Sequence, residues 1–418
     1  MVFGFAKLSK MIFTAQCCYE YLYKTHTNNI GLTKWQELAD IKTIIFLFKN
    51  LHKSKKNCNF ARKIAQHTDM IRKIAIIAGG DSSEYGVSLR SAAGIYSFID
   101  KEKYALTIVK IRGIEWHALA QTDQEIAQNN GAVPEDSPMW VEIDKNDFSF
   151  VYQGTKTTFD FAYITIHGTP GENGILQGYL DMIGVPYSCC GVLAAAMTFN
   201  KYTCNHYLKE FGIRVAESVL LRSSEVQKFS SEEIVKHVGL PCFIKTNVGG
   251  SSFGVTKVKT LEEVEPAIKK AFAEGDEVIC EAFMKGIEIT CGAYKTKKKA
   301  VAFPITEVVT SNEFFDYDAK YNGQVDEITP ARIPDAVRDE VQAQTLKIYD
   351  ILGCQGIIRV DYILTEAIGR DGLDINLLEV NTTPGMTATS FIPQQIRAAG
   401  LEIGEVLGEI IEDAAERL

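Results

Sequence analysis

The sequence has 418 residues, of which 46% are hydrophobic, so it can bury a large core and should divide into roughly two to four domains. It contains no apolar run of about eighteen residues, the length that a membrane-spanning helix needs, so no membrane segment is expected. The formal net charge is −9, and residues 70–418 alone carry 33 Lys and Arg against 49 Asp and Glu, a balance that argues against nucleic acid as the main partner.

Residues 1–69 differ in kind from the rest, because they hold 11 Lys and Arg against only 4 Asp and Glu. Lys7 and Lys10 interrupt the opening apolar run, so a secretory signal is not predicted. Met70 directly precedes an apolar strand pattern of the kind that often begins an α/β domain. We interpret residues 1–69 as an extension, or as the product of an upstream start codon, without a catalytic role.

Residues 70–200 are expected to form an N-terminal open parallel α/β domain. The apolar run at 74–78 is typical of a parallel strand buried on both faces, and a second strand is predicted at 163–166. Ligands bind at the carboxyl ends of strands in such sheets, where Glu84 and His167 lie. The alternatives are that Glu84 only caps a helix and that His167 satisfies a buried turn.

Residues 201–291 are predicted to form a small lid domain. Lys201 begins a helical stretch, and Lys245 ends a predicted strand. A Gly/Ser loop follows Lys245 and leads into another strand, so its backbone N–H groups could fold over phosphates. The Lys precedes the glycines and no helix follows, so this is not a Walker A loop; alone it could be an ordinary loop.

The end of this segment suggests a nucleotide crevice. Glu281 and Glu288 could accept hydrogen bonds from an adenine amine and from ribose hydroxyls, and Phe283 and Met284 would supply apolar flanks. Ordinary core packing is the alternative for the two apolar residues. A loop at 314–321, rich in aromatic and charged residues, is typical of a segment that covers a site.

Residues 292–418 are predicted to form a catalytic domain built on two neighbouring strands. Arg359 and Asp361 alternate along the first strand, as do Glu379 and Asn381 along the second. Two carboxylates and an amide oxygen are hard ligands suited to Mg²⁺ that carries polyphosphate. The alternative is a solvated face with a surface salt bridge. The closing apolar stripe at 403–414 predicts an amphipathic helix that packs on its own domain.

The ten cysteines include no CxxC pair, and several, such as Cys242 and Cys280, lie in apolar stretches. This usage is typical of free thiols in a reducing cytosol rather than of a disulfide framework or a zinc site. A cytoplasmic protein is therefore expected.

From about Lys73 to the C-terminus, roughly 345 residues, the chain closely resembles the D-alanine–D-alanine ligases of the ATP-grasp superfamily. The order of the motifs is highly specific, although no one motif is. They are Ala78-Gly79-Gly80 with Glu84, His167-Gly168 with Gly171-Glu172-Asn173-Gly174, Lys245 with Gly250-Ser251-Ser252, Tyr317 with Lys320-Tyr321, Arg359-Val360-Asp361, and Glu379-Val380-Asn381 with Gly385-Met386.

The resemblance implies an α/β, more strictly an α+β multi-domain, protein of ATP-grasp architecture. It also implies a ligase that makes D-alanyl-D-alanine for peptidoglycan precursors and cell-wall synthesis. A carboxylate is a poor electrophile, so ATP would first convert one D-alanine to an acyl phosphate. The amine of a second D-alanine would then attack, and phosphate would leave. Most of the catalysis should be positioning and charge stabilisation.

The family pattern implies substrate roles for several residues. Glu84 would bind the ammonium of the first D-alanine, with His167 close to it. Arg359 and the backbone near Gly385 would stabilise the oxyanion of the tetrahedral intermediate. The remaining roles fall to loop and helix residues: Ser251, Tyr321 and Glu84 would form a hydrogen-bonded set that orders the lid, and Ser390 and Phe391 would hold the carboxylate of the second D-alanine.

The same pattern implies an ATP and metal site and a homodimer. Lys201 and Lys245 would grip the ATP phosphates, with Lys320 on the transferred one. Asp361, Glu379 and Asn381 would hold two Mg²⁺ ions, with Glu379 bridging them and Mn²⁺ as a possible substitute. The other nucleotide contacts would come from Ser252, Glu281, Phe283, Met284 and Glu288.

Three positions depart from the better-known pattern: Gly249, where an acidic residue is common; Phe283, in place of Trp; and Phe391, in place of Leu. They bear on affinity and not on the reaction class. Tyr321 favours an amino acid as the second substrate. Two alternatives remain open: a ligase that uses D-lactate or D-serine as the second substrate, and an inactive ATP-grasp domain that serves as a nucleotide-binding or scaffold protein.

Overall fold

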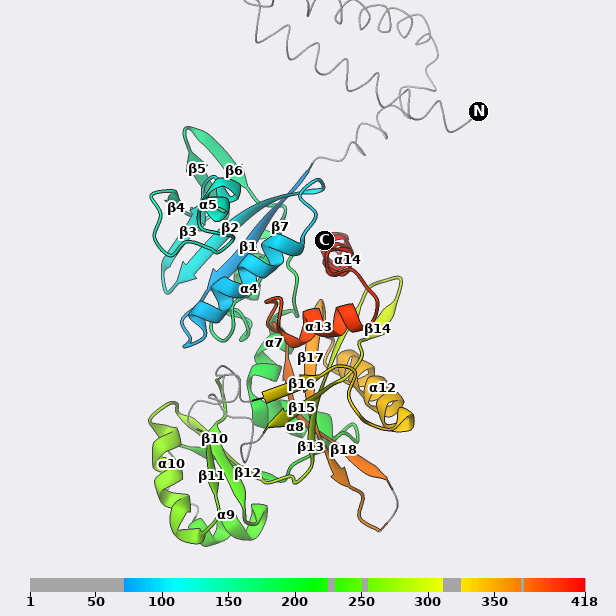
Figure 1. The fold of residues 1–418 in the computed structure, drawn as a ribbon. Coiled ribbons are helices and arrows are strands. Elements are labelled where there is room, and N and C mark those ends of the chain that lie inside the picture. The colour runs from blue at the N-terminus through cyan, green and yellow to red at the C-terminus, as the bar shows by residue number, and fades with distance from the viewer. Residues whose placement is uncertain (1–70, 225–229, 250–254, 311–324, 370–371, 418) are drawn as a thin grey trace, which may run out of the picture. The chain divides into compact units, whose positions relative to one another are not determined.

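The computed structural model describes residues 71–224, 230–249, 255–310, 325–369 and 372–417 (Figure 1). The extension predicted at 1–69 lies outside these residues. Within them the strands form sheets of five, four, seven and two strands, which confirms the predicted α/β class. None of the described helices combines the length and the hydropathy that crossing a bilayer requires.

The five-stranded sheet belongs to the N-terminal part and has the order β4-β3-β2-β1-β7. The first strand, β1, runs parallel to β2 and β7, as predicted for a strand buried on both faces. Ile74 and Ile76 pack on one side with α4, and Ala75 and Ile77 pack on the other with α6. The bounds are β1 (Arg72–Gly79), β2 (Tyr104–Arg112), β3 (Glu115–Leu119), β4 (Trp140–Glu142), β7 (Phe161–Ile164), the hairpin β5 (Ser149–Tyr152) and β6 (Thr155–Thr158), and α4 (Tyr85–Phe98), α5 (Thr122–Gln128), α6 (Ile175–Ile183) and α7 (Val192–Phe199).

The four-stranded antiparallel sheet forms the lid and has the order β11-β10-β12-β9. The pairing of β10 with β11 confirms the predicted strand–loop–strand hairpin that follows Lys245. A capping box between Ser230 and Glu233 starts α9, which packs on this sheet with α10. The bounds are β9 (Ser218–Arg222), β10 (Cys242–Thr246), β11 (Thr256–Val258), β12 (Glu277–Ala282), α9 (Ser231–Val238), the 3-10 turn η2 (Leu261–Glu263) and α10 (Val264–Phe272).

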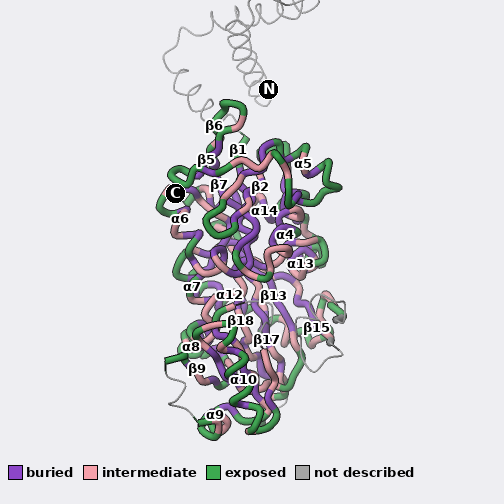
Figure 2. Tube along the Cα trace, turned by 90° about the vertical axis from the view of Figure 1, so that its left-hand side faces the viewer, coloured by how far each residue is buried: buried purple, intermediate pink, exposed green. Residues whose placement is uncertain are grey.

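The seven-stranded sheet has the order β16-β15-β13-β17-β18-β8, with β14 paired to β13. The antiparallel pairing of β17 with β18 confirms the predicted neighbouring strands. Strands β13 and β17 are largely buried, and β18 alternates between buried and half-buried residues (Figure 2). The bounds are β8 (Arg214–Val215), β13 (Ile287–Lys295), β14 (Ala300–Ala302), β15 (Thr306–Thr310), β16 (Val325–Ile328), β17 (Ile357–Glu366), β18 (Leu373–Asn381), α8 (Lys201–Lys209), α12 (Asp335–Ile351), α13 (Phe391–Ala398) and α14 (Ile403–Ala415).

The division into domains at 200/201 and 291/292 stays a prediction. The second boundary falls inside β13, which pairs with β17 along nearly its whole length. The first boundary places α8 in the lid, whereas its buried Cys204 and Leu208 pack into the core of the seven-stranded sheet.

The C-terminal helix α14 is amphipathic, as its apolar stripe predicts, and it joins the first and last parts of the fold. Its apolar face lies in one core with β1, α4 and α13. At one end Arg72 and Tyr104 each donate to Glu412 at 2.9 Å, and the hydroxyl of Tyr294 donates to Glu409 at 2.9 Å. The helix therefore packs beyond its own predicted domain, on the N-terminal sheet as well.

Candidate functional site

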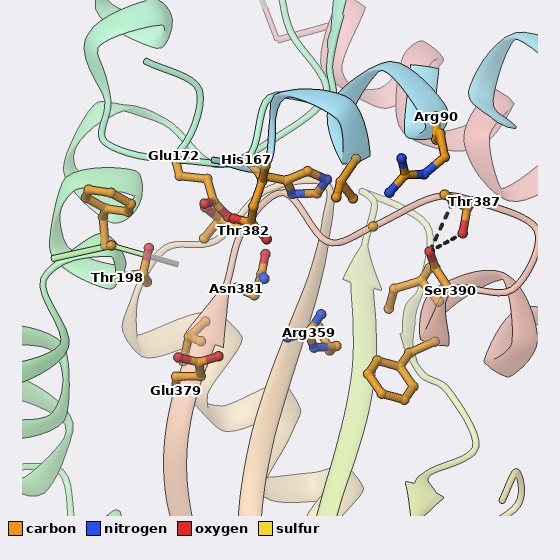
Figure 3. Close-up of a pocket in the computed structure, with 18 of the residues that line it drawn as sticks. Arg90, His167, Glu172, Thr198, Arg359, Glu379, Asn381, Thr382, Thr387 and Ser390 are labelled. Carbon is orange, nitrogen blue, oxygen red and sulfur yellow. Dashed lines mark hydrogen bonds between the residues drawn. The ribbon is translucent and has the colours of Figure 1, made fainter. Parts of the chain in front are cut away.

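A cavity of about 390 Å³ is lined by residues from all three predicted domains (Figure 3). Helix α8 contributes Lys201, the loop after β10 contributes Gly249, and the strand pair contributes Arg359. The lining is completed by Glu84, Val87, Arg90, His167, Glu172, Thr198, Phe199, Glu327, Glu379, Val380, Asn381, Thr382, Gly385, Thr387, Thr389, Ser390, Phe391 and Ile392.

The strand pair β17–β18 forms one wall of this cavity. Its register sets Arg359 opposite Asn381 and Asp361 opposite Glu379. The Arg359 guanidinium donates twice to Asp361, at 2.9 and 2.8 Å, and both side chains are largely buried. Burial works against the charge of Arg359, but Asp361 and then Glu379 and Glu172 hold its pKa above the usual value. The pair is therefore a buried bidentate ion pair and not a solvated salt bridge.

Of the three oxygen donors predicted to bind metal, Glu379 and Asn381 lie on this wall, whereas Asp361, opposite Glu379 in the strand register, is not among the residues that line the cavity. Glu379 and Asn381 line the cavity, and the amide oxygen of Asn381 accepts from the Thr383 N–H at 3.2 Å. No group of three or more His, Cys, Asp or Glu side chains gathers as a metal site in the described part of the chain. Two carboxylates and an amide fit Mg²⁺, because that ion is usually held by one or two carboxylates together with substrate phosphates.

Two lysines approach the same wall from the lid side. The Lys201 ammonium donates to the Gly249 carbonyl at 2.7 Å and lies 3.9 Å from a Glu379 oxygen. Lys245 does not line the cavity; its ammonium pairs with Glu281 at 2.6 Å. Burial lowers the pKa of Lys245, but Glu281 and Glu379 more than reverse this effect. Lys245 thus lies within electrostatic reach of Glu379.

Glu84 and His167 form the opposite wall. Glu84 is the N-cap residue of α4, yet its side chain makes no capping hydrogen bond, so the capping alternative is not supported. His167 is 5% exposed. Burial, aided by the charge of Arg359, holds the pKa of His167 below its usual value, although Glu84 and the Thr383 backbone act in the other direction. The ring is therefore neutral at pH 7.

The end of the cavity is formed by the loop after β18 and the start of α13. Ser390 accepts from the Thr387 N–H at 3.1 Å and shares a 2.7 Å hydrogen bond with the Thr387 hydroxyl (Figure 3). The Phe391 ring lies 5.5 Å from the Arg359 guanidinium carbon, at cation–π range. Gly385 lies beside Ser390, because a Cβ at that position would be 3.0 Å from the Ser390 hydroxyl.

The predicted adenine contacts are not part of this cavity. Glu281 is buried in β12 against Lys245. Phe283 and Met284 follow β12 and are half-buried, and Lys257 lies 4.2 Å from the Phe283 ring. Glu288 lies on β13. Four further predicted residues, Ser251, Ser252, Lys320 and Tyr321, lie outside the described residues.

Glu172 was not assigned a role from sequence, although it lies in the motif that follows His167. It accepts from the Gly168 N–H at 2.6 Å and lines the cavity. Burial raises its pKa to about 7, and Glu84 acts in the same direction, against the Gly168 N–H hydrogen bond, the nearby Thr383 side chain and the charge of Lys201. Sequence reasoning also missed Arg90, Thr198, Glu327 and Thr382, which line the cavity.

The raised pKa of Glu172 predicts a pH-dependent stability for the ligand-free protein. The native state holds this proton up to about pH 7, whereas an unfolded glutamate loses it near pH 4.5, so stability falls as pH rises between these values. Glu172→Gln does not titrate there, so its stability relative to wild type should rise by about 1 to 3 kcal/mol from pH 5 to pH 8. Urea unfolding at both pH values measures this difference. If the difference in unfolding free energy between Glu172→Gln and wild type were the same at both pH values, the buried position of the Glu172 carboxyl would be contradicted.

Two family models match the chain, D-ala D-ala ligase N-terminus over residues 73–190 and D-ala D-ala ligase C-terminus over residues 207–412. The D-alanine–D-alanine ligase of Bacteroides fragilis is 64% identical over 344 residues, which cover 82% of this chain and 99% of that protein.

Two solved structures resemble the fold. The VanG D-Ala:D-Ser ligase from Enterococcus faecalis has a TM-score of 0.71 at 31% identity, over 82% of this chain and 98% of that one. A D-alanine–D-alanine ligase from Bacillus anthracis complexed with ATP has a TM-score of 0.62 at 26% identity, over 82% and 98%. These neighbours confirm the predicted ATP-grasp architecture. Because the two family models match most of the sequence and the Bacteroides protein is so similar, the chain belongs to the D-alanine–D-alanine ligase family.

Proposed function

We propose that the protein joins two D-alanine molecules to D-alanyl-D-alanine at the expense of ATP, for peptidoglycan precursor synthesis. The observation that carries this function is the strand pair in the cavity. It presents Glu379 and Asn381 beside Arg359, with Lys201 on the lid side and Glu84 on the opposite wall. The cavity therefore combines three kinds of groups: cations suited to phosphate, oxygen donors suited to a divalent ion, and a carboxylate suited to an ammonium.

The first half-reaction needs a phosphate held in line with a carboxylate. Lys201 and Lys245 supply positive charge near Glu379 for the ATP phosphates. We propose that Asp361, Glu379 and Asn381 hold two Mg²⁺ ions, for which Mn²⁺ can substitute. Bound there, the ions would neutralise phosphate charge. Glu84, on the far wall, would bind the ammonium of the first D-alanine and so point its carboxylate across the cavity.

The second half-reaction makes an oxyanion when the second amine attacks the acyl phosphate. Arg359 is held by Asp361 in a fixed orientation and faces the cavity, so it can stabilise that charge without reorganising. The backbone at Gly385 lies at the same end. Ser390 and Phe391, at the start of α13, would hold the carboxylate of the second D-alanine.

D-Serine is a second candidate for the attacking substrate, because the VanG neighbour is a D-Ala:D-Ser ligase at 31% identity. The 64% identity to a D-alanine–D-alanine ligase favours D-alanine. Product analysis with D-alanine alone, with added D-serine and with added D-lactate separates these cases.

Phosphate release and dipeptide formation test the function together. With ATP, Mg²⁺ and D-alanine, the wild type should release phosphate and form D-alanyl-D-alanine in equal amounts. Glu379→Ala should lower turnover by at least about 100-fold, because it removes a carboxylate that would hold the Mg²⁺ ions against the ATP phosphates. Glu366→Ala, at the far end of β17, is the control and should keep normal turnover. Comparable turnover of Glu379→Ala and wild type would refute the metal assignment.

We also propose that the protein is a homodimer through an apolar face of α6 and α7. Ile175 and Met182 on α6 are 61% and 88% exposed, and Val192 and Leu193 on α7 are 42% and 74% exposed. The two helices lie side by side, because a Cβ at Gly178 would be 3.7 Å from Val192. Such a cluster of large apolar side chains favours a second copy as its partner.

The double variant Met182→Glu/Leu193→Asp should therefore be monomeric where the wild type is dimeric, because it places charges in the contact. Size-exclusion chromatography with light scattering measures the mass. Ile114→Asp is the control, since Ile114 is 85% exposed and lies outside this face. A wild type that stays monomeric at micromolar concentration would refute the proposal.

A cytoplasmic location completes the proposal. ATP is a cytoplasmic substrate, and the described cysteines at 189, 190, 204, 242, 280, 291 and 354 are all free thiols, as a reducing compartment would keep them.

A further inference from the structure

The loop after β18 carries Gly385 and is hydrogen-bonded to the N-terminal part of the chain at two points. The Thr383 hydroxyl donates to the Ile166 carbonyl at 3.1 Å. Three residues later, the Met386 N–H donates to the Ser91 hydroxyl at 3.3 Å. Helix α4 lies directly against this loop, because a Cβ at Gly94 would come within 2.2 Å of the Met386 carbonyl.

Ser91 links this loop to His167. Its side chain is fully buried on α4, and its hydroxyl lies 3.5 Å from the His167 Nε2. The Ser91 oxygen accepts a hydrogen bond from the Met386 N–H, so its own O–H can donate to Nε2. In a neutral ring Nε2 can be the accepting nitrogen. The ring's other nitrogen can then donate toward the Thr383 backbone, which lies close enough to favour the charged form of the ring. Ser91 and His167 together therefore span the loop from Thr383 to Met386.

We propose that Ser91 is a positioning residue for the ligation: it ties the Met386 backbone to the His167 ring and so holds Gly385 where the oxyanion forms. The inference rests on the proposed function, and it assigns to His167 a structural task beyond contact with the first substrate. Without the Ser91 hydroxyl, the Met386 N–H and the His167 Nε2 would both lose their partner in a buried place.

The expected loss lies in turnover and not in ground-state binding. An oxyanion exists only beyond the ground state, so a displaced Gly385 backbone weakens a contact made in the transition state. Ser91→Ala should therefore lower kcat by about tenfold or more while the KM for ATP stays within about twofold.

Ser88 offers a matched control on the same helix. It is also a fully buried serine, and its hydroxyl also makes two hydrogen bonds, from the Gly79 N–H at 2.9 Å and to the Thr165 carbonyl at 2.8 Å. Neither of these two hydrogen bonds of the Ser88 hydroxyl goes to His167 or to the 383–386 loop. Ser88→Ala should therefore lower the melting temperature about as much as Ser91→Ala but leave kcat within about twofold of wild type.

Amide hydrogen exchange at Met386 gives a readout that a general loss of stability would not reproduce. This amide should be protected in the wild type and in Ser88→Ala, and it should exchange faster in Ser91→Ala. Equal kcat in the two serine variants, or unchanged exchange at Met386 in Ser91→Ala, would overturn the inference. Should Ser91→Ala fail to fold, an unprotected Met386 amide in the wild type would overturn it equally. A wild type that makes no D-alanyl-D-alanine would instead count against the proposed function.

Discussion

The charge balance around Arg359 is the constraint on which the site depends. Glu84, Glu172 and Glu379 all face one cavity, whose lining also contains the cations Arg90, Lys201 and Arg359. Taking a carboxylate out of water is costly unless a cation or hydrogen-bond donors replace the water. Arg359, fixed by Asp361, offsets part of that cost. The pKa of Glu172 is still raised to about 7, so the balance between buried carboxylates and cations is incomplete in the ligand-free site. A substrate ammonium and a divalent cation would complete it, so the unfavourable charge arrangement and the ability to bind ligands have one origin.

The fold creates this arrangement by joining elements that are distant along the chain. The register of β17 and β18 brings Arg359 and Glu379 onto one wall, and the buried apolar faces of both strands fix that register. The loops after β1 and β7 bring Glu84 and His167 to the other wall, at the carboxyl ends of parallel strands. Helix α14, bonded to both the N-terminal and the seven-stranded sheets, keeps the walls together.

Sequence patterns predicted the strands well and the close contacts poorly. The apolar run in β1, the alternation in β17 and β18 and the lid hairpin follow from periodicity that a single strand carries. The role of Glu172 could not be predicted, because its raised pKa depends on burial and on Glu84 in another loop. Ser91 looked like any small helix residue, since its partners belong to two loops that only tertiary packing brings together. Lys320, predicted to contact the transferred phosphate, lies outside the described residues.

The most direct measurement is a crystal structure with Mn²⁺ and a non-hydrolysable ATP analogue, with the metal located by its anomalous scattering. The account predicts that the metal peaks lie in bonding contact with Glu379 and with Asp361 or Asn381, and that the analogue's phosphates lie between them and Lys201. An ordered nucleotide whose metal lies away from these side chains, or no metal peak with the nucleotide bound, would contradict it.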